Sequence, residues 1–227
     1  MPLISVITPA SRGVKELTRL VRDFKNQTLP KEYWEHIIVY DGTPPADVLS
    51  FIEAHKNDYN LKFVSIDKDM GNIKIAPGTR PRNYGTSIAT GTYCYYFDDD
   101  DRAFDKLMET LLDGMTENSV SVVQMSCQES RIYRDGDPKR IVFLPETGLM
   151  QFPQICHVGT PCFMVPTKWA KENPWQHVSE HDFHFINTIV QRYKPQVLIH
   201  PVCCVDVDSL MIGTLKDWVS IPPFYRG

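Results

Sequence analysis

The chain has 227 residues, of which 42% are hydrophobic and 23% charged, and its formal net charge is −4. This composition is typical of a soluble globular protein with a substantial core, and the length suits one large α/β domain. The acidic balance argues against a general nucleic-acid surface, and no apolar run approaches the roughly 18 residues that a membrane-spanning helix needs.

Strand and helix signals alternate along the first half of the chain. Short β-rich runs predict strands, and apolar residues at helical spacing predict helices. The predicted strands lie at 3–8, 36–40, 61–66 and 92–97, and the predicted helices at 14–24, 48–55 and 82–89. Ser11, which lies between the first strand and the first helix, is a candidate N-cap.

This alternation implies an α/β fold built on a parallel sheet with right-handed crossovers. Ligands of such sheets bind beyond the carboxyl ends of the strands. Polar or turn-forming groups occupy three of these ends, namely Thr8 with Pro9, Asp41, and the four aspartates at 98–101. We therefore expect these residues to meet at one site.

The second half of the chain is less regular. A helix is predicted at 104–115, strands at 120–125 and 160–165, a hairpin from 131 to 143 that turns at Asp135-Gly136, a helix at 182–192 and an apolar run at 197–202. The segment 145–161 has many turn formers, so we interpret it as a loop that closes over the site. The tail from 210 to 227 carries no clear prediction.

Four consecutive aspartates, Asp98 to Asp101, follow the aromatic run at 93–97. Carboxylate oxygens are hard ligands that suit Mg²⁺ or Mn²⁺. Alternate residues of an extended segment point to the same side, so Asp98 and Asp100 are expected to face one ion while Asp99 and Asp101 point elsewhere. The alternative is a solvated acidic turn in which Asp101 caps the following helix. A buried strand that delivers four carboxylates favours the metal site, because their repulsion needs a cation.

Four segments of the first half form an ordered set: Ser5-Val6-Ile7-Thr8-Pro9, Ile37 to Gly42, Arg82-Asn83-Tyr84-Gly85, and the run that contains Ala89, Gly91, Tyr93 and Phe97 to Asp101. In this order along the chain, they resemble the family 2 glycosyltransferases of the GT-A fold. The resemblance implies a Rossmann-like, mostly parallel central sheet flanked by helices, with a smaller irregular acceptor-side part. It covers the first half of the chain closely, and we expect one domain over 1–227, with a nucleotide-sugar half at 1–101 and an acceptor half at 102–227.

The resemblance also implies roles for the matching residues. Thr8, Pro9 and Asp41 would line the base pocket, and Arg82 and Asn83 would lie beside the base or diphosphate. Asp98 and Asp99 would bind the nucleotide sugar, and Asp100 and Asp98 would hold the metal. His200, after an apolar run, is a further candidate metal ligand, although a lone histidine there is more often structural.

The catalytic base of the family is usually the aspartate of an acidic pair that opens a helix in the acceptor half. Here the matching segment is Glu180-His181-Asp182, with His181 where the family usually has an acid. Asp182 fits the register best, and Glu180 is the alternative. An aspartate at a helix N-terminus is favoured by the helix dipole whatever its function. Two further features carry less weight. The segment from His157 to Thr160 could belong to the acceptor-side loop that the family places next to the donor sugar. Trp175 could stack on a sugar ring, although a partly buried tryptophan is more often structural.

These features predict an inverting transfer of a sugar from a nucleotide sugar, expected to be a UDP-sugar, to an acceptor hydroxyl, with Mn²⁺ or Mg²⁺ as cofactor. The acceptor, an unidentified glycan or other hydroxyl compound, is not readable from the sequence, and thymidine or guanosine donors stay open. Two alternatives are a nucleotidyltransferase acting on sugar phosphates and a non-catalytic carbohydrate-binding protein. The first usually has a Gly-rich basic loop after the first strand, where this chain has Pro9-Ala10-Ser11-Arg12.

The six cysteines form no CxxC pair, and the chain opens without a signal-peptide pattern. We therefore interpret the cysteines as reduced thiols and expect a cytoplasmic protein. Membrane contact, if present, would be peripheral, no nucleic-acid partner is expected, and the oligomeric state is not readable.

Overall fold

The computed structural model describes residues 2–67, 76–128, 141–145 and 152–206. The strands are β1 (Ile4–Ala10), β2 (Trp34–Asp41), β3 (Leu61–Ile66), β4 (Tyr93–Tyr96), β5 (Asp101–Ala103), β6 (Ser119–Gln128), β7 (Ile141–Leu144), β8 (Phe163–Pro166) and β9 (Gln196–Asp206). The helices are α1 (Val14–Lys25), α2 (Ala46–His55), α3 (Thr79–Ile88), α4 (Leu107–Leu112), α6 (Thr167–Glu172) and α7 (His181–Tyr193), with short 3₁₀ helices η1 (Lys31–Tyr33) and η2 (Thr160–Cys162).

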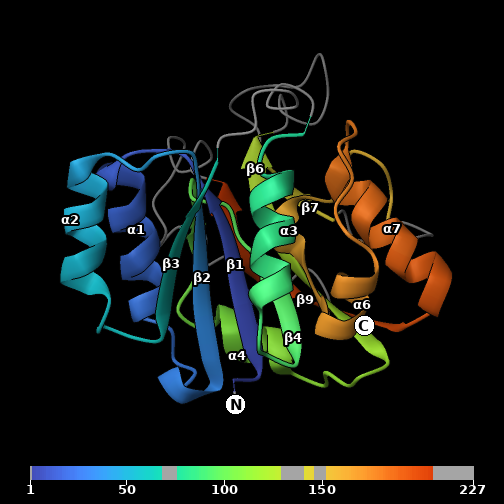
Figure 1. Ribbon diagram of the computed structural model, residues 1–227. Helices are drawn as coiled ribbons and strands as arrows, with labels where there is room; N and C mark the ends of the chain where they lie inside the picture. Colours follow the sequence, from blue (N-terminus) through green and yellow to red (C-terminus); the bar gives the residue numbers. More distant parts are fainter. Residues whose placement is uncertain (1, 68–75, 129–140, 146–151, 207–227) are drawn as a thin grey trace.

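These strands form one sheet with the order β3-β2-β1-β4-β8-β6-β9-β5, and β7 pairs with β6 (Figure 1). β3, β2, β1 and β4 are parallel, as predicted from the alternating strands and helices. β8 then pairs antiparallel with both β4 and β6, which makes the second half of the sheet mixed. The α/β class with a mostly parallel sheet in its first half is confirmed.

The order of the strands reverses between β1 and β4. The chain runs outward from β1 through β2 to β3 and then returns to place β4 on the other side of β1. Right-handed crossovers therefore put α1 and α2 on one face and α3 on the opposite face, where α3 packs on β1 and β2. The carboxyl ends of β1 and β4 consequently border a crevice, which is the usual ligand position in this type of sheet.

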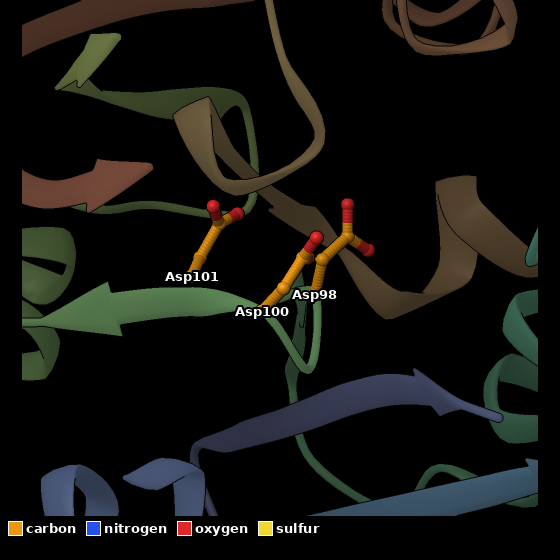
Figure 2. Close-up of side chains that lie close together, drawn as sticks. All are labelled: Asp98, Asp100 and Asp101. Atoms are coloured by element: carbon orange, nitrogen blue, oxygen red, sulfur yellow. The ribbon is translucent and has the colours of Figure 1, made fainter. Parts of the chain in front are cut away.

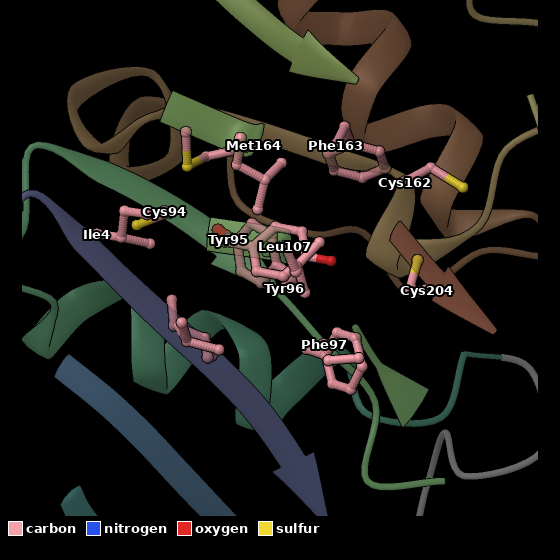
Figure 3. Close-up of a cluster of buried hydrophobic side chains, with 14 of the residues drawn as sticks. Ile4, Cys94, Tyr95, Tyr96, Phe97, Leu107, Cys162, Phe163, Met164 and Cys204 are labelled. Carbon is pink, nitrogen blue, oxygen red and sulfur yellow. The ribbon is translucent and has the colours of Figure 1, made fainter. Parts of the chain in front are cut away.

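The core lies on both faces of the central strands. Every residue of β4 is buried, and all but one residue of β1 and of β2 are buried, which explains their continuous apolar sequences. Figure 3 shows part of this core, in which Tyr95, Tyr96 and Phe97 lie among side chains of β1, β8 and the short helices. The strand that ends at the aspartates is thus held rigidly by packing.

Two glycines allow helices and turns to approach β1 closely. A Cβ on Gly85 of α3 would lie 2.5 Å from Cγ2 of Ile7, and a Cβ on Gly91 would lie 2.7 Å from the backbone nitrogen of Ser5. Both glycines belong to the segments that resemble the family pattern. Their role here is steric, because any side chain would push α3 or the α3–β4 turn away from the sheet.

Several local predictions differ from the structure. Gly13, and not Ser11, is the N-cap of α1, and no side chain caps this helix. Asp101 does not cap a helix but begins the short strand β5, which the sequence pattern missed. The predicted helix at 104–115 is limited to α4, and the predicted strand at 160–165 begins as the 3₁₀ helix η2.

The predicted hairpin is only partly inside the described residues. Its second strand is β7, which pairs antiparallel with β6 over Met125–Gln128. Three predicted features lie outside the described residues, namely the strand at 131–133, its turn at Asp135-Gly136 and the tail from 210. Residues 146–151 of the loop predicted at 145–161 also lie outside them. None of the described helices has the length and hydropathy needed to cross a membrane, and cytoplasmic location stays a prediction.

Candidate functional site

A cavity of about 440 Å³ opens at the carboxyl edge of the sheet, in the crevice between β1 and β4. Its volume is in the range of sites for small molecules and cofactors. The described residues that line it come from the loop after β1 (9–12), Asp41 at the end of β2, the start of α3 with the residues before it (76–82), the aspartates 98–100 and His177. Most of the polar strand ends singled out in the sequence therefore meet at one place.

The aspartates after β4 form a tight turn, closed by a hydrogen bond of 3.3 Å from the backbone nitrogen of Asp101 to the backbone oxygen of Asp98. This turn gathers Asp98, Asp100 and Asp101, each with one carboxylate oxygen within 4.8 Å of the others (Figure 2). Asp99 points away from them and accepts a hydrogen bond of 3.3 Å from the backbone nitrogen of Ser11. The expected grouping of Asp98 with Asp100 is thus present, but Asp101 joins it because the segment is a turn rather than an extended strand.

Two arginines pair with this turn in the part of the chain that the structure describes. Arg82 donates to Oδ1 of Asp98 at 2.6 Å, and Arg12 contacts Oδ2 of Asp100 at 2.6 Å and Oδ1 of Asp99 at 3.7 Å. Two guanidinium groups therefore already balance part of the negative charge of the four aspartates, so a metal ion is not their only possible counterion. Burial nevertheless raises the pKa of Asp99 to about 6, with the neighbouring Asp100 and Asp98 adding to the shift and Arg12 opposing it.

The three grouped carboxylates fit a divalent cation. Among the described residues they form the one cluster of three or more acidic, histidine or cysteine side chains with ligand atoms this close together. All their ligand atoms are carboxylate oxygens, which are the ligands that Mg²⁺ and Mn²⁺ prefer. A cation bound here would compete with Arg12 and Arg82 for Asp100 and Asp98.

Arg82 is the centre of a buried polar network. The residue is buried, and Nη1 donates to the backbone oxygen of Pro77 at 3.0 Å. Its guanidinium lies over the ring of Trp175, 4.8 Å from the centroid, and Nη2 donates to Oγ1 of Thr160 at 3.2 Å. Trp175 is 2% exposed, so its role is to support Arg82 rather than to stack on a sugar.

The same network reaches Asp182 in the first turn of α7. The hydroxyl of Thr160 accepts from Arg82 and donates to Oδ1 of Asp182 at 2.6 Å. Burial raises the pKa of Asp182, although His181, Arg82 and the Thr160 hydroxyl act in the opposite direction. Asp182 is therefore a carboxylate of increased basicity, linked through one hydroxyl and one guanidinium to the aspartate turn.

The imidazole of His181 contacts both Asp182 and the guanidinium of Arg82. Its Nε2 is 3.2 Å from Nη1 of Arg82 and 3.4 Å from Oδ1 of Asp182. Burial lowers the pKa of His181, so the neutral ring can accept a hydrogen bond from Arg82. Glu180, the alternative base, is exposed and occupies the N-cap position with φ of 50°, without a side-chain cap. The structure therefore brings Asp182, and not Glu180, into the Arg82 network.

Three of the residues expected at the site lie elsewhere. The hydroxyl of Thr8 is buried below the cavity, 2.9 Å from Nε2 of His36. The side-chain amide of Asn83 donates to the backbone oxygen of Trp175 at 3.0 Å and accepts from its nitrogen at 2.8 Å, so it fastens α3 to the segment before α7. Both residues support the site without lining the cavity.

His200 is the third of these residues. It lies opposite Val123 in the middle of β9, whereas the end of that strand, at Asp206, pairs with Asp101. At about 3.3 Å per residue, the intervening strand separates His200 from the aspartate turn by roughly 20 Å. His200 is therefore no ligand of the cluster, and its expected role as a metal ligand is not supported.

Arg12 was not predicted to belong to the site, and the segment at 157–160 was predicted beside the donor sugar without a role for the Thr160 hydroxyl. The signal for Arg12 was a single basic residue in the loop after the first strand, directly opposite the aspartate turn. Thr160 had no local signal, since its partners Arg82 and Asp182 are 78 and 22 residues away in sequence.

The profile described as "Glycosyl transferase family 2" matches residues 5–173. The chain belongs to glycosyl transferase family 2. This match runs from β1 to the end of α6, and it includes the aspartate turn, Thr160 and the residues that line the cavity apart from His177.

Among curated relatives of this family 2 chain, the poly(ribitol-phosphate) β-N-acetylglucosaminyltransferase TarS of Staphylococcus aureus is 31% identical over 101 residues, which are 44% of this chain and 17% of TarS. The cholesterol galactosyltransferase of Borreliella burgdorferi is 28% identical over 179 residues, 74% of this chain and 47% of that protein. The chain thus matches less than half the length of either relative.

Solved structures of similar fold include TarS residues 1–349 of S. aureus, with a TM-score of 0.68, 19% identity and coverage of 93% of this chain and 63% of that one. The mannosyltransferase PcManGT of Pyrobaculum calidifontis, solved with GDP-Man and Mn²⁺, has a TM-score of 0.65 at 13% identity, with coverage of 91% and 57%. At these identities the likeness establishes the fold, which is the GT-A fold of the family.

Proposed function

We propose that this chain transfers a sugar from a UDP-sugar to an acceptor hydroxyl with inversion at the anomeric carbon, and that it uses Mn²⁺ or Mg²⁺. One observation carries the proposal: Arg82 and Thr160 connect Asp98, at the donor cavity, with Asp182, a carboxylate whose pKa is raised by burial. The hydrogen bonds through Thr160 thus fix two groups relative to each other: Arg82, which could bind the leaving diphosphate, and Asp182, which could accept a proton. Membership of glycosyl transferase family 2 supports the same reaction.

The cavity is the proposed donor site. Pro9 and Asp41 would contact the base, with Asp41 accepting a hydrogen bond from a pyrimidine N–H, and Arg82 and Asp99 would border the diphosphate and ribose. A similar fold has been solved with UDP and with UDP-GlcNAc in TarS, which supports a uridine donor. Thr8 and Asn83 enter this proposal only as residues that hold β1 and α3 in place.

Asp98, Asp100 and Asp101 would hold the metal ion, since their oxygens lie within 4.8 Å of one another. A bound divalent cation would stabilise the negative charge that develops on the departing diphosphate. Arg82, held in place by four partners, supplies a fixed positive charge on the same side.

Asp182 would act as general base. Its carboxylate removes the proton of the acceptor hydroxyl while the hydroxyl oxygen attacks the anomeric carbon. Because the diphosphate leaves from the opposite side in the same step, the configuration inverts and no covalent sugar intermediate is needed. The Thr160 hydroxyl keeps Oδ1 of Asp182 in one orientation, which leaves Oδ2 for the acceptor.

The test is a product assay with UDP-GlcNAc, UDP-galactose and UDP-glucose in the presence of Mn²⁺ and a panel of hydroxyl acceptors. We expect UDP release that stops on addition of EDTA and is lost in Asp182→Asn, while that variant still binds UDP. Release of pyrophosphate instead would indicate nucleotidyl transfer. Binding of the donors without any turnover would indicate a carbohydrate-binding protein, and either result would overturn the proposal.

A further inference from the structure

Arg12 differs from Arg82 in its freedom to move. The side chain of Arg82 is 4% exposed and has four hydrogen-bonding partners, whereas that of Arg12 is 49% exposed and forms ion pairs with Asp100 and Asp99. A half-exposed guanidinium on a long flexible stem gains little from such a pair, about 0–1 kcal/mol at most sites. Arg12 can therefore leave Asp100 at low cost.

The backbone of Arg12 is held independently of its side chain. The Tyr40 hydroxyl donates to the backbone oxygen of Ser11 at 3.4 Å and to that of Arg12 at 3.3 Å, and the Ser11 nitrogen donates to Asp99. The loop after β1 thus keeps its position at the cavity whatever the Arg12 side chain does. Replacement of this side chain should leave the fold intact.

A divalent cation and Arg12 compete for the same carboxylate. Asp100 belongs to the group of three oxygens that fit a cation, and it is also the residue that Arg12 contacts at 2.6 Å. Two positive groups on one carboxylate repel each other strongly when water is partly excluded. Asp99 and Glu16 also attract Arg12, and because Arg12 lines the cavity, an anionic ligand bound there would lie within its reach.

We propose that Arg12 is a binding residue for the donor diphosphate, which it reaches by exchanging Asp100 for a phosphate when a divalent cation binds the aspartate turn. The inference rests on the proposed function. A guanidinium can contact two phosphate oxygens at once, which makes such a pair stronger than the exposed contact it replaces. Asp100 would thereby pass from one positive partner, Arg12, to another, the divalent cation.

The proposal predicts that replacing Arg12 changes the affinities for Mn²⁺ and for UDP in opposite directions, which isothermal titration calorimetry can measure. In Arg12→Gln, Mn²⁺ alone should bind about two- to fivefold more tightly, because an exposed competitor has been removed. UDP in saturating Mn²⁺ should bind about tenfold more weakly, because a charge-assisted hydrogen bond is lost. Arg12→Lys, which keeps the charge without the forked geometry, should fall between these values for UDP.

Arg19→Gln is the matched control, since Arg19 lies on the neighbouring helix α1 and pairs with Glu16 at 3.2 Å. It should bind both ligands like the wild type. Unchanged or weakened Mn²⁺ binding in Arg12→Gln, or unchanged UDP binding, would overturn the role of Arg12 and leave the proposed function standing. A wild-type protein that binds neither Mn²⁺ nor UDP would instead overturn the proposed function.

Discussion

At the scale of single residues, the site depends on side chains that hold other side chains. Asp182 depends on Thr160 for its orientation, because the Thr160 hydroxyl donates to it at 2.6 Å and also accepts from Arg82. Arg82 in turn is oriented by Pro77 and by the ring of Trp175. Removal of one positioning group should therefore change the properties of the base without touching the reacting atoms.

We predict that Thr160→Val lowers kcat about tenfold or more and moves the acidic limb of the pH–rate profile to higher pH. Burial raises the pKa of Asp182, and the Thr160 hydroxyl, His181 and Arg82 lower it while Asp98 raises it. Loss of the hydroxyl therefore raises the pKa further, so that the base becomes protonated, and inactive, at a higher pH. Thr160→Ser should restore the profile, and a serine variant as impaired as the valine variant would contradict this role.

At the scale of elements, the strands and helices of the first half could be predicted because each carries a local pattern. β2 overlaps its predicted run because a buried parallel strand has a continuous apolar sequence, and the partly buried β3 coincides with the run predicted at 61–66. β5 was missed because it is three residues long and begins with a carboxylate that resembles a helix cap. Short elements are thus the hardest to predict from sequence. A three-residue polar strand has too few residues to show a pattern and is defined only by its pairing with another strand, here β9.

The composition of the site was only partly predictable, for a related reason. Asp41, Arg82 and the aspartates at 98–100 follow strands or open helices, and all of them line the cavity. The links between them are long-range: Arg12 reaches Asp99 and Asp100, and Thr160 reaches Arg82. His200 shows the opposite error, since a histidine after an apolar run was placed at the site while β9 carries it away.

At the scale of the whole molecule, the reversal of strand order at β1 places the cavity between two rigid strands. Buried polar groups below the cavity contribute to this rigidity. His36 in β2 is fully buried, with Nε2 2.9 Å from the Thr8 hydroxyl and Nδ1 3.1 Å from the Tyr59 hydroxyl. Because this ring has to stay neutral, the fold should respond to pH through it.

We predict that the free energy of unfolding decreases as the pH falls below 6.5. Burial lowers the pKa of His36 from 6.5 to about 3, so between these values the unfolded chain binds a proton that the folded chain does not. The stability from this group is present above 6.5 and is lost toward pH 3, by about 1.4 kcal/mol per pH unit. Urea titrations at pH 7 and at about pH 5 should show a smaller difference in His36→Gln, with exposed His177→Gln as control. An equal pH dependence in the wild type and His36→Gln would refute this account.

We propose that the turn after β4 gathers carboxylates to hold a divalent cation beside the donor. The most direct measurement is a titration of the protein with Mn²⁺, followed by electron paramagnetic resonance, for the wild type and Asp100→Ala. We expect one bound ion in the wild type, binding that UDP strengthens, and a loss of affinity of about tenfold or more in Asp100→Ala, while exposed Asp113→Ala binds normally. Mn²⁺ binding by Asp100→Ala that equals that of the wild type would contradict the claim.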